Sequence, residues 1–115
     1  MSKRDFLLYC SDISDAGSAI VEYVNGLSFE EFCQDRKTYS AVIREFEIIG
    51  EAAGKLPDSI REKYNHIEWQ DIKDFRNLLI HEYFGVDLEI VWNVIKDDLP
   101  GVLNAVNEIL DAASE

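Results

Sequence analysis

Apolar side chains recur along three long segments of this chain at alternating spacings of four and three residues. A repeat of about 3.5 residues places these side chains on one side of an α-helix and is typical of helices packed in a bundle. No segment of comparable length alternates with the period of two expected for a strand. The stripes comprise Phe6, Cys10, Ile13, Gly17, Ile20, Val24 and Leu27; Val42, Phe46, Ile49, Ala53 and Leu56; and Leu88, Trp92, Ile95, Leu99, Val102, Val106, Ile109 and Ala113.

Residues that begin and end helices stand at the borders of these stripes. Asn25-Gly26 provides a stop for the first helix, and Ser28 with Glu31 predicts a capping box that opens a short second helix. Pro100 stands inside the last stripe without breaking its register, which favours a kink rather than a break. The other expected caps and stops are Thr38, Asp58 or Ser59 for a short turn through Tyr64, Gly85 and Asp87.

The chain of 115 residues is predicted to form a single domain, 1–115, of the all-α class. We expect an antiparallel up-down bundle of four long helices, at about 4–25, 38–56, 69–84 and 87–113, with short helices between them. The longest apolar runs are three residues, and the N-terminus is followed by a charged amphipathic pattern. We therefore expect no membrane helix, no signal peptide and a cytoplasmic location, with Cys10 and Cys33 as buried, reduced thiols.

Several apolar side chains fall outside these single stripes. A helix with two apolar sides buries one side within its own subunit and the other against a partner. The sequence therefore predicts a homodimer with a helical interface. The side chains concerned are Leu7, Val21, Ile48, Phe75, Leu78 and Val91.

The segment from Arg76 to Tyr83 places polar side chains on a helix that otherwise has a buried pattern. At about 100° per residue, Arg76 leaves the helix from the middle of its apolar stripe, between Ile72 and Ile80. Arginine is rarely buried without a partner. The azimuth of His81 differs from that of Arg76 by about 140°, so the two side chains diverge within one helix. They can serve one site only across an interface, which again favours a dimer.

The chemistry of this pair suits cleavage of RNA without a metal ion. A histidine titrates at about pH 6.5 and transfers protons at neutral pH, while the guanidinium of an arginine matches a phosphate. His81 is therefore a candidate for proton transfer, Arg76 for phosphate binding and Asn77 for a supporting polar role. From the residues alone, an equally good interpretation pairs Arg76 with an acid across the interface, such as Glu47 or Glu51, as a structural contact.

Glu47 and Glu51 form a second cluster with Gly50 and Gly54. The two carboxylates are four residues apart and repel each other unless a cation lies between them, and Arg76 is the obvious candidate. The two glycines permit a close approach of helices. This cluster does not supply enough ligands for a metal site, so we expect neither a metal ion nor another cofactor.

Tyr83 lies close in azimuth to Arg76. It either packs in the core with its hydroxyl at the rim, or places that hydroxyl beside the phosphate site, where it can bind or be modified. The formal net charge of −12 repels nucleic acid at long range. RNA binding must therefore depend on a local site, or else the natural partner is a basic protein.

The sequence Arg76-x4-His81-x-Tyr83 resembles the motif of the HepT-like family, the toxins of HepT/MntA toxin–antitoxin pairs within the HEPN superfamily. The arginine and histidine alone are a weak signal, whereas the motif with its tyrosine is specific. The resemblance extends over most of the chain in ordered blocks, which are 26–32, 48–53, 75–84 and 86–92.

The resemblance implies an all-α homodimer with the motif from two subunits lining a cleft. It implies a type VII toxin whose metal-independent ribonuclease activity depends on Arg76 and His81, with Asn77 as a frequent HEPN residue after the arginine. It also implies a partner, a minimal nucleotidyltransferase antitoxin of the MntA type, which transfers AMP from ATP to Tyr83. An added AMP places negative charge and bulk beside Arg76, where an RNA phosphate would bind.

Two other interpretations stand beside this one. The first is a non-catalytic nucleotide- or protein-binding module, in which Arg76 binds a phosphate or an acid of another protein and Tyr83 is chiefly an AMP acceptor. The second is a purely structural helical dimer, which predicts that methionine is tolerated in place of Arg76.

Overall fold

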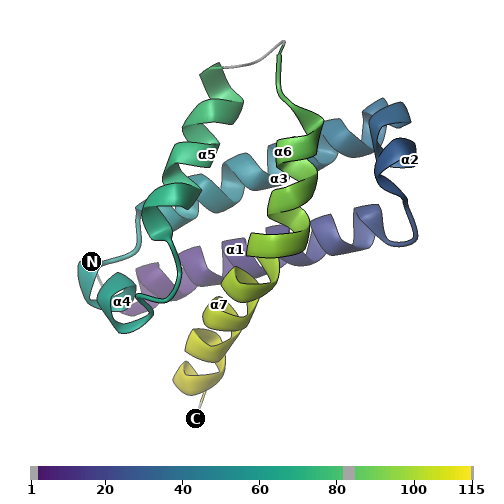
Figure 1. Ribbon diagram of the computed structural model, residues 1–115. Helices are drawn as coiled ribbons and strands as arrows, with labels where there is room; N and C mark the ends of the chain where they lie inside the picture. The colour runs from purple at the N-terminus through teal and green to yellow at the C-terminus, as the bar shows by residue number, and fades with distance from the viewer. Residues whose placement is uncertain (1–2, 82–84, 115) are drawn as a thin grey trace.

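The computed structural model describes residues 3–81 and 85–114, and all regular structure in these residues is helical (Figure 1). This confirms the predicted all-α class. No helix in these ranges is long and apolar enough to cross a membrane. In chain order the elements are α1 (Lys3–Val24), α2 (Phe29–Gln34), α3 (Arg36–Gly54), α4 (Asp58–Lys63), α5 (Trp69–His81), α6 (Leu88–Asn93), the π-helical η1 (Val94–Asp98) and α7 (Leu99–Ala113).

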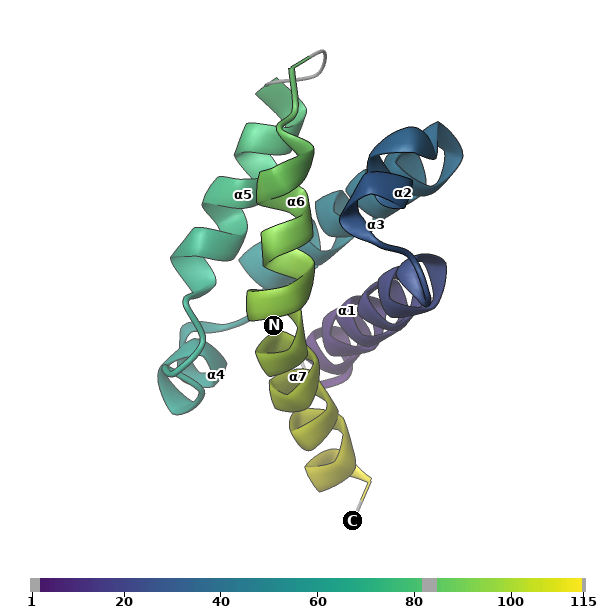
Figure 2. The same ribbon diagram turned by 45° about the vertical axis from the view of Figure 1, so that its right-hand side comes forward.

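Two antiparallel pairs of helices make up the bundle. α1 and α3 run in opposite directions, and so do α5 and the rod formed by α6, η1 and α7 (Figures 1 and 2). The second pair lies across the first instead of continuing one parallel array. α1 meets α7 at Gly17, where an added Cβ would lie 3.0 Å from Leu103 Cγ. The crossing therefore depends on a residue without a side chain.

The predicted stripes supply most of the core between these helices, and residues from outside the stripes, Phe32 and Val91 among them, complete it. The largest fully buried side chains are Phe32, Ile13, Ile20, Leu56, Val42, Val91, Val106 and Cys10. Removing each aliphatic side chain from water stabilises the fold by about 1.5–3 kcal/mol. Cys10 and Cys33 are both free thiols, but only Cys10 is buried, so the predicted burial is wrong for the half-buried Cys33.

Several helix ends have the predicted chemistry. Gly26 ends α1 with a φ of 80°, a left-handed conformation that glycine adopts without strain. The Ser28 hydroxyl accepts the Glu31 N–H at 3.1 Å, and the Glu31 carboxylate accepts the Ser28 N–H at 3.0 Å. This is the expected capping box. The predicted cap at Asp87 is also confirmed, because its carboxylate accepts a backbone N–H in the first turn of α6.

Two predicted caps are wrong. Thr38 does not begin the third long helix, because Asp35 Oδ1 accepts the Thr38 N–H at 3.1 Å and the helix starts earlier. Neither Asp58 nor Ser59 caps α4, since its N-cap residue is Pro57, which has no polar side chain. In both places a neighbouring residue in the sequence occupies the cap position, an error of one to three residues.

Pro100 distorts the helix in the turn that precedes it. The Leu99 N–H donates to the carbonyl of Val94, five residues back, and the segment between them is the π-helical η1. Proline has no N–H and its ring clashes with the carbonyl four residues before it. A π-helical turn accommodates this, because it widens the hydrogen-bonded ring. The chain continues through Pro100 as predicted, and the distortion takes the form of a π-turn.

The apolar residues assigned to a partner-facing side range from exposed, through the half-buried Leu7, Ile48 and Phe75, to fully buried. Val21 and Leu78 are 51% and 39% exposed, as a partner-facing side requires. Val91 is fully buried within the subunit, so its assignment is wrong. Phe75 packs edge-on against Phe46, with ring centroids 5.1 Å apart. The homodimer itself stays a prediction.

Candidate functional site

α5 carries the polar segment, and contacts along its length fix it against the bundle. At its start the Trp69 indole N–H donates to the carbonyl of Tyr64 at 3.1 Å. Further along, Phe75 packs on Phe46 of α3, and Leu79 is only 2% exposed. One face of α5 is thus held against α3, and this fixes where the remaining side chains point.

Arg76 lies directly on a glycine of α3. A Cβ added at Gly50 would lie 2.6 Å from Arg76 Cγ and closer still to Arg76 Cβ. Real Cβ atoms do not approach other carbons this closely, so any larger residue at position 50 must displace the arginine stem. The close helix approach predicted for Gly50 is therefore confirmed. It is not found at Gly54, where an added Cβ would stand in open space.

The guanidinium of Arg76 is half-buried and incompletely paired. Its Nε is buried and has no hydrogen-bond partner among the described residues. Its Nη1 donates to Asn77 Oδ1 at 3.5 Å, beyond the usual range for such a bond. A buried donor without an acceptor costs about 1–3 kcal/mol. The arginine is therefore held in a position where an acceptor from outside the described chain would be stabilising.

The buried stripe of α5 is not centred where the sequence predicts. Ile80 is 40% exposed, whereas Leu79 is buried. Arg76 therefore stands at the edge of the buried face rather than in its middle. The reason is that α3 supports only the Leu79 side of the helix, so the apolar side chain of Ile80 reaches solvent.

His81 and Asn77 lie on the outer face of α5, between two exposed apolar side chains. Taking Arg76 as zero, the azimuths are about +100° for Asn77, +140° for His81, +40° for Ile80 and −160° for Leu78. His81 is exposed and is the last helical residue before the described chain is interrupted. Ile80 and Leu78, 40% and 39% exposed, flank this polar centre on its two sides. The divergence of His81 from Arg76 stays a prediction of helical periodicity.

Glu47 and Glu51, the two predicted supporting acids, each form an ion pair with a basic residue three or four positions away. Glu47 lies 3.7 Å from Arg44, and Glu51 lies 3.6 Å from Lys55. Within the described ranges neither forms an ion pair with Arg76. Pairing with Arg76 of a second subunit, and the supporting role of Glu47 and Glu51, stay predictions.

Two further predictions concern metal and modification. In residues 3–81 and 85–114, no group of three or more His, Cys, Asp or Glu side chains is placed to hold a metal ion. The expectation of a metal-free site stays an expectation. Tyr83, the predicted site of modification, lies outside the described residues. So does the end of the helix for which Gly85 was the predicted stop.

A family model described as "Ribonuclease HepT-like" matches residues 13–109. This span includes Gly50, Arg76, Asn77 and His81. The chain belongs to the HepT-like family. No solved structure matches the chain.

Relatives of this HepT-like chain match it over nearly its full length. "Probable ribonuclease HepT" of Thermococcus cleftensis is 40% identical over 100 residues, which are 87% of this chain and 91% of that protein. "Putative RNase TTE0752" of Caldanaerobacter subterraneus subsp. tengcongensis is 41% identical over 102 residues, 89% of this chain and 91% of that protein. "Putative RNase MJ0127" of Methanocaldococcus jannaschii is 36% identical over 110 residues, 96% of this chain and 91% of that protein.

The HepT-like geometry adds one residue that the sequence did not single out as part of the site. Gly50 was expected to let helices approach, together with Gly54, but not to contact the arginine. Only the three-dimensional pairing of α3 with α5 distinguishes the two glycines. The signal in the sequence, two glycines four residues apart, is the same for both.

Proposed function

We propose that this chain is a ribonuclease toxin that acts as a homodimer and cleaves RNA without a metal ion. The observation that carries this proposal is the state of Arg76, a half-buried guanidinium whose Nε lacks an acceptor in the described chain. Five residues further on, the same helix presents an exposed histidine. The names of the relatives, "Probable ribonuclease HepT" among them, support the class of reaction.

The two side chains suffice for the proposed chemistry. The ribose 2′-hydroxyl loses its proton and attacks the adjacent phosphorus, while the bond to the leaving 5′-oxygen breaks and that oxygen gains a proton. His81 supplies or accepts one of these protons. Arg76 binds the phosphate oxygens, on which negative charge grows in the transition state. The products are a 2′,3′-cyclic phosphate and a free 5′-hydroxyl, so no oxidant or second substrate is required.

The proposed site is formed by two subunits. Arg76 and His81 are separated by about 140° in azimuth and about 7.5 Å along the helix axis, so one copy does not direct both at one phosphate. A second copy facing the outer side of α5 brings its own histidine to the arginine of the first. Ile80 and Leu78 then supply the apolar contacts of the interface.

Two cations of α5, Lys73 and Arg76, stand at this site among acidic neighbours such as Asp74. The formal net charge is −12, which disfavours general binding to RNA. On α5, however, the exposed Lys73 lies one turn before Asn77 on the same side of the helix and next to Arg76. The proposed RNA contact is therefore local, with few phosphates engaged at one time.

The biological role that we propose rests on the motif tyrosine. In a type VII toxin–antitoxin pair, an MntA-type nucleotidyltransferase would transfer AMP from ATP to the hydroxyl of Tyr83 and release pyrophosphate. The AMP phosphate would then compete with RNA for Arg76. The resemblance of Arg76-x4-His81-x-Tyr83 to the family motif supports this role.

A second candidate is a non-catalytic module that binds a nucleotide or a protein through Arg76 and accepts AMP at Tyr83. The state of His81 favours this alternative. Its imidazole has no hydrogen-bond partner in the described part of the chain, so no residue there orients it for proton transfer. In the dimeric enzyme a residue of the second copy would have to orient the His81 imidazole.

One assay separates the two candidates. The purified chain is incubated with labelled RNA in EDTA and in magnesium, and cleavage is followed on a gel. We expect equal cleavage in both buffers and a loss of at least about 100-fold in His81→Ala. His66→Ala is the matched control, because His66 is an exposed histidine outside α5. Cleavage that persists in His81→Ala, or that disappears in EDTA, contradicts the proposed mechanism.

The modification is tested separately by intact mass after incubation with an MntA-type nucleotidyltransferase and ATP. We expect the mass of AMP on the wild-type chain and on Tyr23→Phe, a control tyrosine on α1. Tyr83→Phe should remain unmodified. An adduct retained in Tyr83→Phe excludes this tyrosine as the acceptor.

A further inference from the structure

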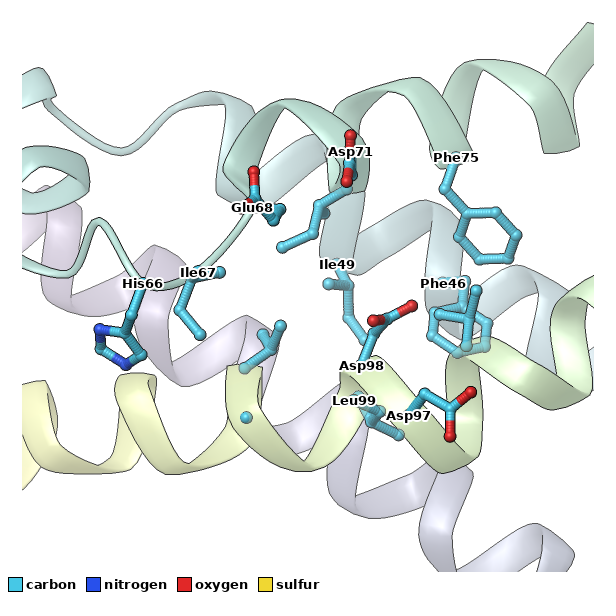
Figure 3. A pocket seen from close by; sticks show the side chains of 14 residues that line it. Phe46, Ile49, His66, Ile67, Glu68, Asp71, Phe75, Asp97, Asp98 and Leu99 are labelled. Carbon is cyan, nitrogen blue, oxygen red and sulfur yellow. The ribbon is translucent and has the colours of Figure 1, made fainter.

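A cavity of about 340 Å³ lies between the beginning of α5 and the segment in which η1 joins α7 (Figure 3). Its floor is apolar and comes from α3, α5 and α7. The side chains that matter most are Phe46, Ile49, Phe75, Leu99 and Val102. The volume is within the range of about 300–1,000 Å³ that is usual for small-molecule sites.

The cavity is distinct from the site proposed for RNA. On α5 its lining residues Asp71, Ile72 and Phe75 lie at azimuths of about −140°, −40° and −100° from Arg76. His81 is at about +140° on the outer face, near the far end of the helix. Neither Arg76 nor His81 lines the cavity.

Four carboxylates stand around this apolar space. Glu68 directly precedes α5, Asp71 lies in its first turn, and Asp97 and Asp98 come from η1 (Figure 3). The basic residue that lines the cavity is His66, no lysine or arginine does so, and none of the four carboxylates forms an ion pair with any residue the structure describes. Four carboxylates therefore stand against one imidazole around the cavity, which disfavours a phosphate as the natural occupant.

The cavity has two acidic rims, one at the start of α5 with Glu68 and Asp71 and one on η1 with Asp97 and Asp98. The negative charge of Asp71 on the first rim affects Asp98 on the second. Figure 3 shows its carboxylate pointing from η1 toward α5. Asp98 is the N-cap residue of α7 yet makes no capping hydrogen bond, so its oxygens are free for another partner. Burial, and then the charges of Asp97 and Asp71, raise the pKa of Asp98. A cation placed between the rims would relieve this repulsion.

We propose that the cavity binds an aliphatic diamine or polyamine, with its methylene chain on the apolar floor and an ammonium group at each acidic rim. The floor excludes water from the chain of the ligand, and the carboxylates select a cation over a neutral molecule. Across this small cavity an acidic rim is followed by an apolar floor and then by a second acidic rim. A molecule with two ammonium groups joined by methylene groups matches this order. This site does not depend on the proposed ribonuclease activity.

The probe for the test is 1,8-diaminooctane, titrated into the full chain at pH 8 and low salt while amide chemical shifts are recorded. Octane-1,8-diol, of the same length but neutral, is the matched ligand control. We expect saturable shifts confined to the residues around the cavity, weakening as sodium chloride is added. No saturable shifts are expected with the diol.

Two variants test where the ligand binds. Asp71→Asn combined with Asp98→Asn removes one charge from each rim and should weaken diamine binding about 5- to 20-fold. Asp12→Asn, an exposed aspartate on α1, should leave it unchanged. Gly101→Leu should abolish binding by filling the cavity, because a Cβ at Gly101 is only in ordinary contact with Ile67, 3.7 Å away. Position 101 therefore admits a Cβ, from which the longer side chain extends.

Several outcomes would overturn the proposal. They are equal binding of the diol, undiminished binding in the double variant, and diamine shifts spread over the acidic surface. Shifts of the cavity residues that depend on protein concentration without diamine would make a second copy of the chain the occupant instead. Loss of RNA cleavage in His81→Ala has no bearing on any of these results, so the two proposals fail independently.

Discussion

Gly50 and Arg76 are in direct contact across the α3–α5 interface, and an added Cβ at Gly50 would lie 2.6 Å from Arg76 Cγ. The nearest atom is Arg76 Cβ, which is fixed to the backbone and which no rotamer change moves. The position of the guanidinium is therefore coupled to the distance between two helices. This contact makes Gly50 a positioning residue for the proposed phosphate site.

Gly50→Ala should reduce RNA cleavage by more than about tenfold, because α5 must shift to admit the methyl group and a displacement of about 1 Å has this effect on a catalytic geometry. Overpacking should also lower the free energy of unfolding by about 1–3 kcal/mol. Gly54→Ala is the control, since a Cβ there has open space and alanine favours the helix. Cleavage rates and thermal unfolding are measured for both. Equal rates in the two variants would remove the positioning role.

A charge placed on the outer face of α5 should prevent the proposed dimer from forming. Ile80→Lys and Leu78→Lys each put an ammonium group into the proposed apolar interface, and we expect both variants to be monomeric by analytical ultracentrifugation. Helix content should be unchanged, because both side chains are exposed in the monomer. Leu8→Lys, at a 55% exposed leucine on α1, should remain dimeric. A wild-type chain that is itself monomeric contradicts the proposed dimer.

Asp98→Asn should stabilise the fold at neutral pH. Burial and the neighbouring Asp97 and Asp71 raise the pKa of Asp98, so the folded chain binds this proton more tightly than the unfolded chain. The destabilising effect of the charge is therefore fully present above the folded pKa and disappears as the pH falls below the ordinary value of 3.8. The melting temperature of Asp98→Asn should exceed that of the wild type at pH 7, with the difference vanishing at pH 3. A lower melting temperature at pH 7 contradicts this account.

The two thiols should differ strongly in reactivity. Burial raises the pKa of Cys10 to about 11, so little thiolate is present at pH 8 and reagents do not reach it. Cys33 is half-buried. Titration with an aromatic disulfide reagent should therefore show one fast thiol per chain, which is absent in Cys33→Ser, and a second thiol that reacts only on unfolding. Two equally fast thiols would mean that the α1–α3–α7 core opens readily.

Much of the fold is predictable from local chemistry. The spacing of apolar residues identified the long helices, and the Ser28–Glu31 capping box and the Asp87 cap were identified correctly because these bonds join residues two or three apart. The caps at Thr38 and at Asp58 or Ser59 were wrong for different reasons, since Asp35 caps α3 in place of Thr38, whereas α4 begins after Pro57, which has no polar side chain. Which residue occupies a cap position also depends on where the preceding helix ends.

The sequence by itself determined the all-α class, the membership of Arg76, Asn77 and His81 in one helix, and the divergence of the arginine from the histidine. These follow from helical periodicity, which is a property of residues close together in the chain. Only the tertiary structure decided that Gly50 rather than Gly54 lies under Arg76, that Val91 is core, and that four carboxylates gather around one cavity. Such contacts join residues tens of positions apart, and they depend on how helices cross, which no local pattern specifies.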